Sequence, residues 1–289
     1  MATTSEKLVF IGVDGRDVYN ISAPFTYLEQ TVIAGRVEKR DEELSEIVLF
    51  TESNDEWKPV DGAPVFHGLQ DPCATNIGGK LLLGGVRFPI EFPNGETGWQ
   101  MDFYLESGDG QFEKVLSGPP KMKDIRFVQQ AGGSIVVFTR PQGDKGGRGE
   151  IGYFVAQSLE EITHERINAA PLLDLCPEEE WVGANEAHVL ANGKIGVLGH
   201  IARFSHDGHR HYYSMVFCLD PVTGKYSPLE IIAKREDFPA GVAKRPDLVD
   251  VIFSGGIRRL DDGMARLYAG LSDAEAGYVD IPDPFLPFE

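Results

Sequence analysis

The segment Lys123–Pro141, KDIRFVQQAGGSIVVFTRP, has the pattern from which the fold can be inferred. Its second half, SIVVFT, is rich in β-branched and aromatic residues and follows a Gly-Gly pair, which predicts the return strand of a β-hairpin. Its first half places Lys123, Asp124 and Arg126 around the start of the preceding strand. These charged side chains lie either at a solvated strand end or around a ligand. Comparison with the rest of the chain helps to decide between these two interpretations.

The same order of features recurs along the chain: a polar residue, a short strand, a glycine-containing turn and an apolar strand. Clear copies start at Asp71 (DPCATNIGGKLLLGGVRF), Asn185 (NEAHVLANGKIGVLGHIAR) and Asp250 (DVIFSGGIRRLDDGMARLYAGLSDA), and a looser copy starts at Gly15. The leading polar residues, here called the heads, are Asp17, Asp71, Asp124, Glu186 and Asp250. Successive heads are 54, 53, 62 and 64 residues apart, and each interval holds about four strands, as a propeller blade does. The pattern predicts an all-β fold, a five-bladed β-propeller, in one domain over residues 1–289 with an irregular proline-rich tail from about residue 280.

Helical patterns are scarce. SLEEITHERI, residues 158–167, predicts one short helix with Ser158 as its N-cap and Glu161 completing a capping box. The chain shows no alternation of strands with helices and no change of composition that would mark a linker, which supports a single domain.

Composition and charge narrow the class of protein. The formal net charge is −18 and the pI about 4.8, and such a field repels phosphate backbones and anionic membrane surfaces. We expect neither nucleic acid nor a membrane as a partner, while a homo-oligomer remains open. The three cysteines are far apart, which disfavours a disulfide framework. The N-terminus has no basic segment followed by an apolar one, so we expect a cytoplasmic protein.

If the heads lie at one end of the innermost strands, Asp17, Asp71, Asp124 and Glu186 converge on one pocket in the central channel. Close carboxylates raise the pKa of at least one of them, which keeps a proton donor available near neutral pH, as glycosyl transfer requires. Cations accompany them in the sequence, and a mixed pocket of this kind suits a sugar together with an anion such as phosphate. These cations are Arg36, Arg87, Lys123, Arg126 and His200. The alternative is structural: aspartates that cap turns, and ion pairs within or between blades.

Several segments resemble, over residues 8 to 285, a family known only by a domain-of-unknown-function label. They include GRDVYNISAPF, PKMKDIRF, FTRPQGDKGGRGEIGYF, GKIGVLGHIARF, KRPDLVDVIFSGGIRR and LYAGLSDAEAG. That family is similar, more distantly, to the five-bladed propeller β-mannoside phosphorylases and hydrolases, in the superfamily of the arabinanase and invertase propellers. The resemblance implies a glycosidic-bond-cleaving enzyme.

The distant resemblance also implies roles for particular residues. Asp71, in LQDPCAT, looks like the general acid of the phosphorylases, and Asp273, in YAGLSDA, falls near the sugar. Three residues fall where those enzymes contact phosphate: Lys123, Arg126 and His200. Cys73 stands where the phosphorylases usually carry arginine. Glu186 is similar to the general acid of the arabinanase-like enzymes, and Asp17 to their general base, with Asn20 competing for that position.

We therefore predict a carbohydrate-active enzyme that cleaves a β-mannoside-like bond with inversion, by phosphorolysis or by hydrolysis. Asp71 or Glu186 would protonate the glycosidic oxygen, and Asp17 would activate water if the reaction is hydrolytic. The substrate is a glycoside or oligosaccharide; no metal or organic cofactor is expected, and inorganic phosphate is the candidate co-substrate. The residues expected to bind substrate are Asn20, Arg36, Lys123, Asp124, Arg126, Trp181, His200 and Asp273. The alternative is a non-catalytic sugar-binding or scaffold propeller.

Overall fold

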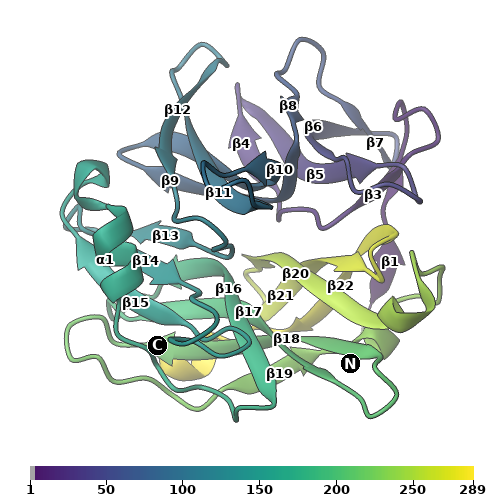
Figure 1. Cartoon of the computed structure of the whole chain (residues 1–289). Helices are drawn as coiled ribbons and strands as arrows, with labels where there is room; N and C mark the ends of the chain where they lie inside the picture. The colour runs from purple at the N-terminus through teal and green to yellow at the C-terminus, as the bar shows by residue number, and fades with distance from the viewer. Residues whose placement is uncertain (1–3) are drawn as a thin grey trace.

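The computed structural model describes residues 4–289, whose regular structure consists almost entirely of β-strands (Figure 1). Strands that follow one another in the chain mostly pair in antiparallel fashion. The hairpin predicted in Lys123–Pro141 is confirmed: β13 (Arg126–Gln129) pairs with β14 (Ile135–Thr139), with Phe127 opposite Val137. The prediction of an all-β protein is therefore correct.

The strands form four hydrogen-bonded sheets, and the largest joins two antiparallel groups through a parallel pair between β18 and β20. The first group contains β2 (Val9–Phe10), β3 (Asp17–Tyr19), β4 (Phe25–Tyr27), β5 (Gln30–Glu38), β6 (Glu46–Ser53), β7 (Glu56–Pro59) and β8 (Phe66–His67). The second contains β9 (Leu69–Ile77), β10 (Lys80–Glu91), β11 (Thr97–Glu106) and β12 (Phe112–Ser117). The third contains β13, β14 and β15 (Gly152–Ala156). The fourth contains β16 (Glu180–Val189), β17 (Ile195–Phe204), β18 (Arg210–Leu219) and β19 (Glu230–Ala233). The fifth contains β20 (Asp250–Arg259), β21 (Met264–Leu271), β22 (Glu275–Pro282) and β1 (Ser5–Lys7).

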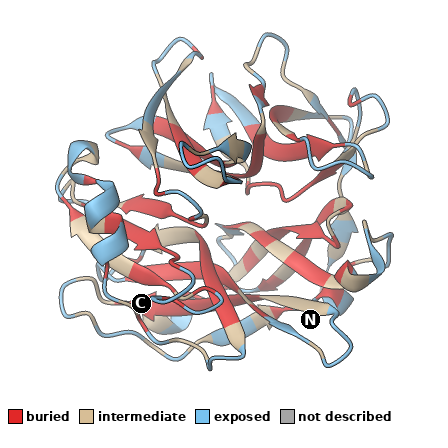
Figure 2. Cartoon of the chain, viewed as in Figure 1, coloured by how far each residue is buried: buried red, intermediate tan, exposed pale blue. Residues whose placement is uncertain are grey.

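The groups follow one another around a common centre (Figure 1). The early strands of successive groups contact one another: β9 contacts β13, β13 contacts β16, and β16 contacts β20. The first and last groups meet where β3 contacts β21 and β22. Five apolar clusters lie between the groups; in one of them Leu82 of the second group packs with Phe127 of the third. Another cluster joins the last group to the first, where Tyr268 packs with Ile33. Figure 2 shows how burial follows the strands, with the exposed residues mostly in the turns.

Two local predictions need correction. The helix expected at residues 158–167 is instead a 3-10 turn, Leu159–Glu161, followed by α1 (His164–Ala169), and Thr163 rather than Ser158 caps α1 by accepting from the Arg166 N–H. The tail is ordered further than expected: β22 continues to Pro282, and a 3-10 turn spans Leu286–Phe288 after the buried Phe285. Further 3-10 turns span Arg235–Asp237 and Pro246–Leu248. Across residues 4–289, no helix has the length and apolar character that crossing a membrane requires.

Candidate active site

Irregularities in the early strands position the polar residues at the centre. In β9 the register shifts so that Asp71 and Pro72 together lie opposite Gly85, and in β16 the shift leaves Asn185 as the extra residue. Asn20, Asp71 and Asp124 have positive φ angles of 45°, 51° and 58°. Aspartate and asparagine tolerate this left-handed region better than other residues with a Cβ atom. Such conformations are costly and concentrate at functional sites, so their recurrence here marks a candidate site.

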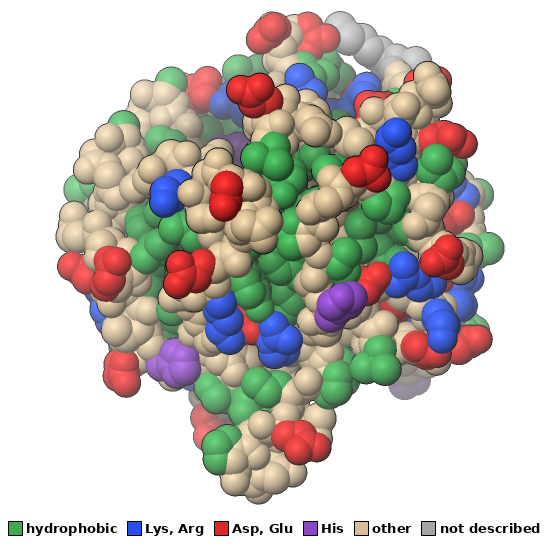
Figure 3. Space-filling model, turned by 90° about the horizontal axis from the view of Figure 1, so that it is seen from above, with side chains coloured by type: hydrophobic (Ala, Val, Ile, Leu, Met, Phe, Trp, Pro, Cys, Tyr) green, Lys and Arg blue, Asp and Glu red, His purple; other side chains and the backbone are tan. Residues whose placement is uncertain are grey.

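These residues open onto a cavity of about 250 Å³, here called the first cavity. It is lined by six basic side chains, Arg36, Lys123, Arg140, Arg210, Lys244 and Arg245, and by four acidic ones, Glu43, Asp71, Asp124 and Asp273. The molecule as a whole has a net charge of −18, and acidic and basic side chains are interspersed over the face seen in Figure 3. A local excess of cations in so acidic a chain indicates a site for an anionic group.

Asp71 is held on one side only. Its Oδ1 atom accepts hydrogen bonds from Asn20 Nδ2 at 2.8 Å and from Arg36 Nη1 at 3.1 Å. Arg36 is itself anchored by Glu38, whose Oε2 accepts from Arg36 Nη2 at 2.8 Å. Among residues 4–289, nothing donates a hydrogen bond to Asp71 Oδ2. One carboxylate oxygen is thus fixed, and the other is left for a ligand.

Asp124 sits among cations. Its Oδ2 atom lies 3.4 Å from Arg140 Nη1 and 4.0 Å from His200 Nε2, and its Oδ1 atom lies 3.8 Å from Arg126 Nη2. Burial acts to raise the pKa of Asp124, but Arg140 foremost, with His200 and Lys123, holds that pKa below its ordinary value. Within the described part of the chain, Asp124 Oδ2 and Arg140 Nη1 are both buried without a hydrogen-bond partner. Unpaired buried polar atoms are rare in folded proteins. A bound hydroxyl would satisfy both atoms, donating to Asp124 Oδ2 and accepting from Arg140 Nη1, whereas a phosphate oxygen would satisfy Arg140 Nη1 alone.

For Asp273 and His200, unlike Asp124, the shift in pKa favours the neutral form of the side chain. Burial raises the pKa of Asp273, and the charge of Asp71 adds to this effect against the opposing Arg36. Burial lowers the pKa of His200 to about 3, so its imidazole is neutral at pH 7. His200 Nδ1 lies 2.8 Å from Asn185 Oδ1. Because that amide oxygen accepts, Nδ1 carries the proton and Nε2 is free to accept from a ligand hydroxyl.

Two further hollows adjoin the first cavity. One, of about 290 Å³, shares Lys123, Arg140, Arg210 and Tyr212 with it and adds Gln142, Arg148, Trp181 and Phe204. The Arg148 guanidinium lies 5.3 Å from the centre of the Phe204 ring, and the Trp181 ring lies 5.0 Å from Phe204. The other hollow, of about 180 Å³, shares Asp71 and Lys123 with the first cavity and is lined in part by Phe88 and Trp99. Aromatic surfaces therefore flank the polar cavity on both sides.

The structure brings together most, but not all, of the residues predicted from the sequence. Those that line the first cavity are Asn20, Arg36, Asp71, Lys123, Asp124, His200 and Asp273. Trp181 lines the adjoining hollow, where its Nε1 donates to the Tyr212 hydroxyl at 3.1 Å. Arg126 is turned away, with Nε donating to the Asn185 carbonyl oxygen at 2.7 Å. It lines a different cavity.

The expectation that Asp17 and Glu186 share a pocket with Asp71 and Asp124 is wrong. Asp17 lies at the start of β3, paired with Arg40, whose Nη2 donates to Asp17 Oδ1 at 2.7 Å. At the head of the first unit, the residue that reaches the cavity is Asn20 instead of Asp17. Glu186 follows the extra residue Asn185 in β16 and lines the cavity that Arg126 also lines. The fifth head, Asp250, accepts hydrogen bonds from the Tyr213 hydroxyl and from His211.

Sequence analysis missed several cations of the site. Arg140 is the clearest, because it ends the return strand of the third unit, as Arg36 and His200 sit near the ends of the return strands in theirs. Applying that pattern to every unit would have found it. Arg210, Tyr212, Lys244 and Arg245 lie outside the repeated segments, and their positions depend on tertiary packing. Arg87 matches the pattern but instead pairs with Asp102 and donates to the Tyr104 hydroxyl at 2.6 Å.

The fold and site together define an all-β protein whose antiparallel sheets surround a cavity of carboxylates and cations. The chain belongs to the family described as Protein of unknown function (DUF1861), whose model matches residues 1–287. This confirms the family resemblance seen in the sequence. No curated protein matches the chain with significance.

Several solved structures are similar to this chain. A structure described as MPT-4, a mannose phosphorylase from Leishmania mexicana, in complex with phosphate ion, is 36% identical with a TM-score of 0.89, and the match covers 98% of this chain and 89% of that chain. Another, MPT-1, a GDP-Man-dependent mannosyltransferase from Leishmania mexicana, is 33% identical with a TM-score of 0.87, covering 98% and 91%. The β-1,2-mannobiose phosphorylase from Listeria innocua, in complex with β-1,2-mannobiose, is 12% identical with a TM-score of 0.65, covering 100% and 99%. That last likeness concerns the fold alone.

In residues 4–289, no three His, Cys, Asp or Glu side chains are grouped so as to hold a metal ion. The residues that line the first cavity offer charge–charge contacts and hydrogen bonds to a ligand instead.

Proposed function

We propose that this protein is a glycoside phosphorylase that acts on mannosides. The observation that carries the proposal is the first cavity, where Asp71, Asp124 and Asp273 face Lys123 and Arg140. Arg140 Nη1 is buried there without a hydrogen-bond partner among the described residues, and a phosphate oxygen would supply one. A 36% identical protein described as a mannose phosphorylase has been solved with a phosphate ion, which supports the assignment.

In the proposed reaction, the bond between the anomeric carbon and the glycosidic oxygen breaks, and a bond from that carbon to a phosphate oxygen forms. Burial raises the pKa of Asp273, and the charge of Asp71 adds to this effect, so Asp273 holds a proton that it passes to Asp71 as the bond breaks. Asp71 delivers this proton through its free Oδ2 to the leaving oxygen. Phosphate, held by Lys123 and Arg140, attacks the opposite face of the sugar and inverts the anomeric carbon. The ionised Asp124 and the neutral His200 accept hydrogen bonds from sugar hydroxyls.

Product analysis tests this proposal. Mannosides, glucosides and arabinosides would each be incubated with the protein, with and without inorganic phosphate. A sugar 1-phosphate that forms only with phosphate supports phosphorolysis. Free sugar at equal rates in both conditions would show a hydrolase and remove the role given to the cations. Binding of an oligosaccharide without any product would support the non-catalytic alternative.

A second candidate activity is mannosyl transfer from a nucleotide sugar. The hollow next to the first cavity favours it, because Lys123, Arg148 and Arg210 there could pair with a diphosphate while Phe204, whose side chain is exposed, could stack on a base. A 33% identical protein is described as a GDP-Man-dependent mannosyltransferase. Incubation with GDP-mannose and a mannose acceptor separates the two activities. Release of GDP with elongation of the acceptor would favour transfer, and elongation only from mannose 1-phosphate would favour the phosphorylase.

We further propose that the five antiparallel groups are the five blades of one propeller domain. The apolar clusters between successive groups, including the cluster that joins the last to the first, support this arrangement. An experimental structure tests it: five separate sheets around one axis are expected, and a fused four-sheet arrangement would contradict it.

A further inference from the structure

A second cavity, of about 380 Å³, lies further along the same early strands. The first cavity receives Asp71 of β9 and Asp124, which precedes β13, whereas the second receives Thr75 and Asn76 of β9 and Phe127 of β13. The nearest lining residues of the two cavities are two positions apart along the chain, Asp71 and Cys73 in β9 and Asp124 and Arg126 at β13, so the cavities are neighbours. They share no lining residue in the part of the chain described. The volume is within the range of roughly 300–1,000 Å³ that small-molecule sites occupy.

The Arg126 and Asn185 side chains lie between the two cavities. Arg126 is 4% exposed, and its Nε and Nη1 atoms donate to the carbonyl oxygens of Asn185 at 2.7 Å and Ile125 at 2.9 Å. Its Nη2 lies 3.8 Å from Asp124 Oδ1, on the side of the first cavity. Asn185 continues this separation through its contact with His200. A ligand in the second cavity would therefore occupy a site of its own rather than an extension of the first.

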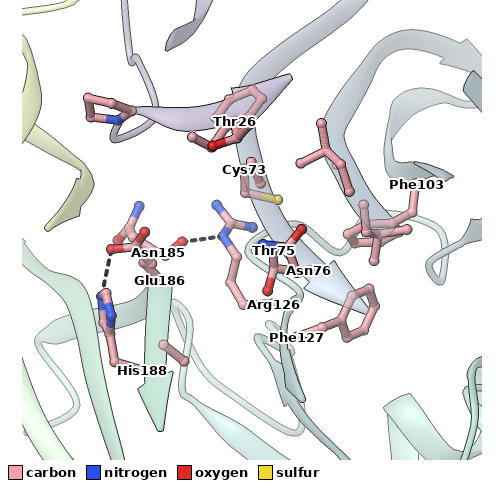
Figure 4. A pocket seen from close by; sticks show the side chains of 17 residues that line it. Thr26, Cys73, Thr75, Asn76, Phe103, Arg126, Phe127, Asn185, Glu186 and His188 are labelled. Atoms are coloured by element: carbon pink, nitrogen blue, oxygen red, sulfur yellow. Dashed lines mark hydrogen bonds and ion pairs between the residues drawn. The ribbon is translucent and has the colours of Figure 1, made fainter. Parts of the chain in front are cut away.

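The second cavity offers hydrogen-bonding groups on opposite walls (Figure 4). On one wall, Glu186 Oε2 lies 2.8 Å from His188 Nε2 and accepts from the Ile257 N–H at 2.6 Å, while Oε1 accepts no hydrogen bond from residues 4–289. On the facing wall are the Thr75 hydroxyl and the Asn76 amide, with Thr26 of β4 at the rim. The Arg126 side chain lies between these two walls, and apolar side chains, among them Phe25 of β4 and Phe103 of β11, complete the lining.

The second cavity lacks the cluster of basic side chains that lines the first. Its charged side chains are Arg126, whose Nη2 lies 3.8 Å from Asp124 Oδ1, and Glu186, which lies 2.8 Å from His188. Burial acts to lower the pKa of His188, but the adjacent Glu186 carboxylate outweighs it and raises that pKa. Free acceptors and donors on facing walls, with apolar surface beside them, suit a molecule with hydroxyl groups and an apolar face, which describes a sugar ring.

We propose that the second cavity is a non-catalytic binding site for a neutral sugar, held through Glu186 Oε1, Thr75 and Asn76. This site does not depend on the activity proposed for the first cavity. It predicts that the chain binds a neutral hexose or mannobiose at a position where no bond is cleaved.

Two matched tryptophan variants test the proposal. Thr26 lies at the rim and is exposed, whereas Val222, in the turn after β18, is 89% exposed and lines neither cavity. Thr26→Trp places a large ring at the mouth of the second cavity, and Val222→Trp adds the same ring far from it in the sequence and outside its lining. Titration calorimetry with mannose and β-1,2-mannobiose at millimolar concentrations gives the number of sugars bound per chain, and thermal unfolding checks that both variants remain folded.

The expected result is one sugar fewer per chain in Thr26→Trp than in the wild type and in Val222→Trp. Glu186→Gln should weaken that same binding event several-fold without abolishing it. If the wild type binds a single sugar and Thr26→Trp abolishes it, the second cavity holds sugar while the first does not, so the proposed function fails and this inference stands. An unchanged number of bound sugars in Thr26→Trp, or no sugar bound by the wild type, would overturn it.

Discussion

Asp71 offers the sharpest test at the scale of single residues. Asparagine keeps the side-chain oxygen that accepts from Asn20 and Arg36, and it tolerates the positive φ of 51° at this position. It cannot deliver a proton. We therefore expect Asp71→Asn to lower kcat by about 10²–10⁴-fold, the usual contribution of a general acid, with little change in the thermal unfolding temperature. The measurement is initial rate with saturating mannoside and phosphate; full activity in the variant would remove Asp71 from the mechanism.

Asp124 makes a prediction about stability and pH. Arg140 and its neighbours hold its pKa below the ordinary value in the folded protein, against the effect of burial. A carboxyl group with a depressed folded pKa contributes stability above its unfolded pKa of about 4, and this contribution is lost as pH falls through the folded pKa. Asp124→Asn should therefore lower the free energy of unfolding at pH 7 by about 3–5 kcal/mol, because it leaves buried cations unpaired.

Urea unfolding of the wild type and of Asp124→Asn at pH 7 and below pH 4 checks this sign. The difference between the two proteins should shrink as the pH falls. Asp261→Asn is the matched control, because Asp261 is exposed in the turn before β21, and it should unfold like the wild type. Equal stability of Asp124→Asn and wild type at pH 7 would contradict the prediction.

Among the strands, the close approach of β16 and β17 sets the position of His200. A Cβ atom on Gly199 would lie 2.3 Å from the Gly183 carbonyl oxygen and 2.7 Å from Met215 Cε. Gly199→Ala must push the two strands apart, which should destabilise the fold by about 1–3 kcal/mol and displace the neighbouring His200. We expect a lower unfolding temperature together with a raised KM. Gly132→Ala is the control, because a Cβ atom there meets nothing within 4 Å; equal behaviour of the two variants would rule out this account.

Strand identity was predictable from the sequence, but strand register was not. The turns and apolar return strands of each unit identified the hairpins, as in β13 and β14. The extra residue in β16 carries no sequence signal, so Glu186 was predicted to point where Asn185 does. Successive side chains alternate between faces, so a slip of one residue sends a side chain to the other side. The same uncertainty applies to the first unit, where the sequence favours Asp17 over Asn20 as the head, but Asn20 lines the cavity.

On the scale of the whole molecule, charge is sorted between surface and site. The net charge is −18, whereas six basic side chains gather around the first cavity. We expect this contrast to favour small anions that fit inside the cavity over nucleic acids that would have to lie along the surface. The sequence predicted the net charge and part of the cluster, but Arg210, Lys244 and Arg245 reach the site only through the folding of segments distant from the repeats.

The N-terminal segment joins the first group to the last. β1 pairs with β22, with Glu6 opposite Tyr278, and β2 pairs with β7 in the first group. Between them, the Leu8 N–H donates to the Ala276 carbonyl oxygen at 2.9 Å. Deletion of the residues before Leu8 should lower the free energy of unfolding by about 2–4 kcal/mol, since each lost backbone hydrogen bond is worth about 1 kcal/mol.

Lys7→Gln separates the backbone contribution from that of the side chain. It removes the ion pair between Lys7 Nζ and Glu275 Oε1, which are 2.9 Å apart and partly exposed, while it keeps β1 paired with β22. Such pairs contribute about 0–1 kcal/mol, so this variant should unfold close to the wild type in urea. If the truncated chain were as stable as Lys7→Gln, the strands after Leu8 would close the structure without β1. A large loss in the truncated chain alone would instead show that backbone pairing by β1 stabilises the junction of the first and last groups.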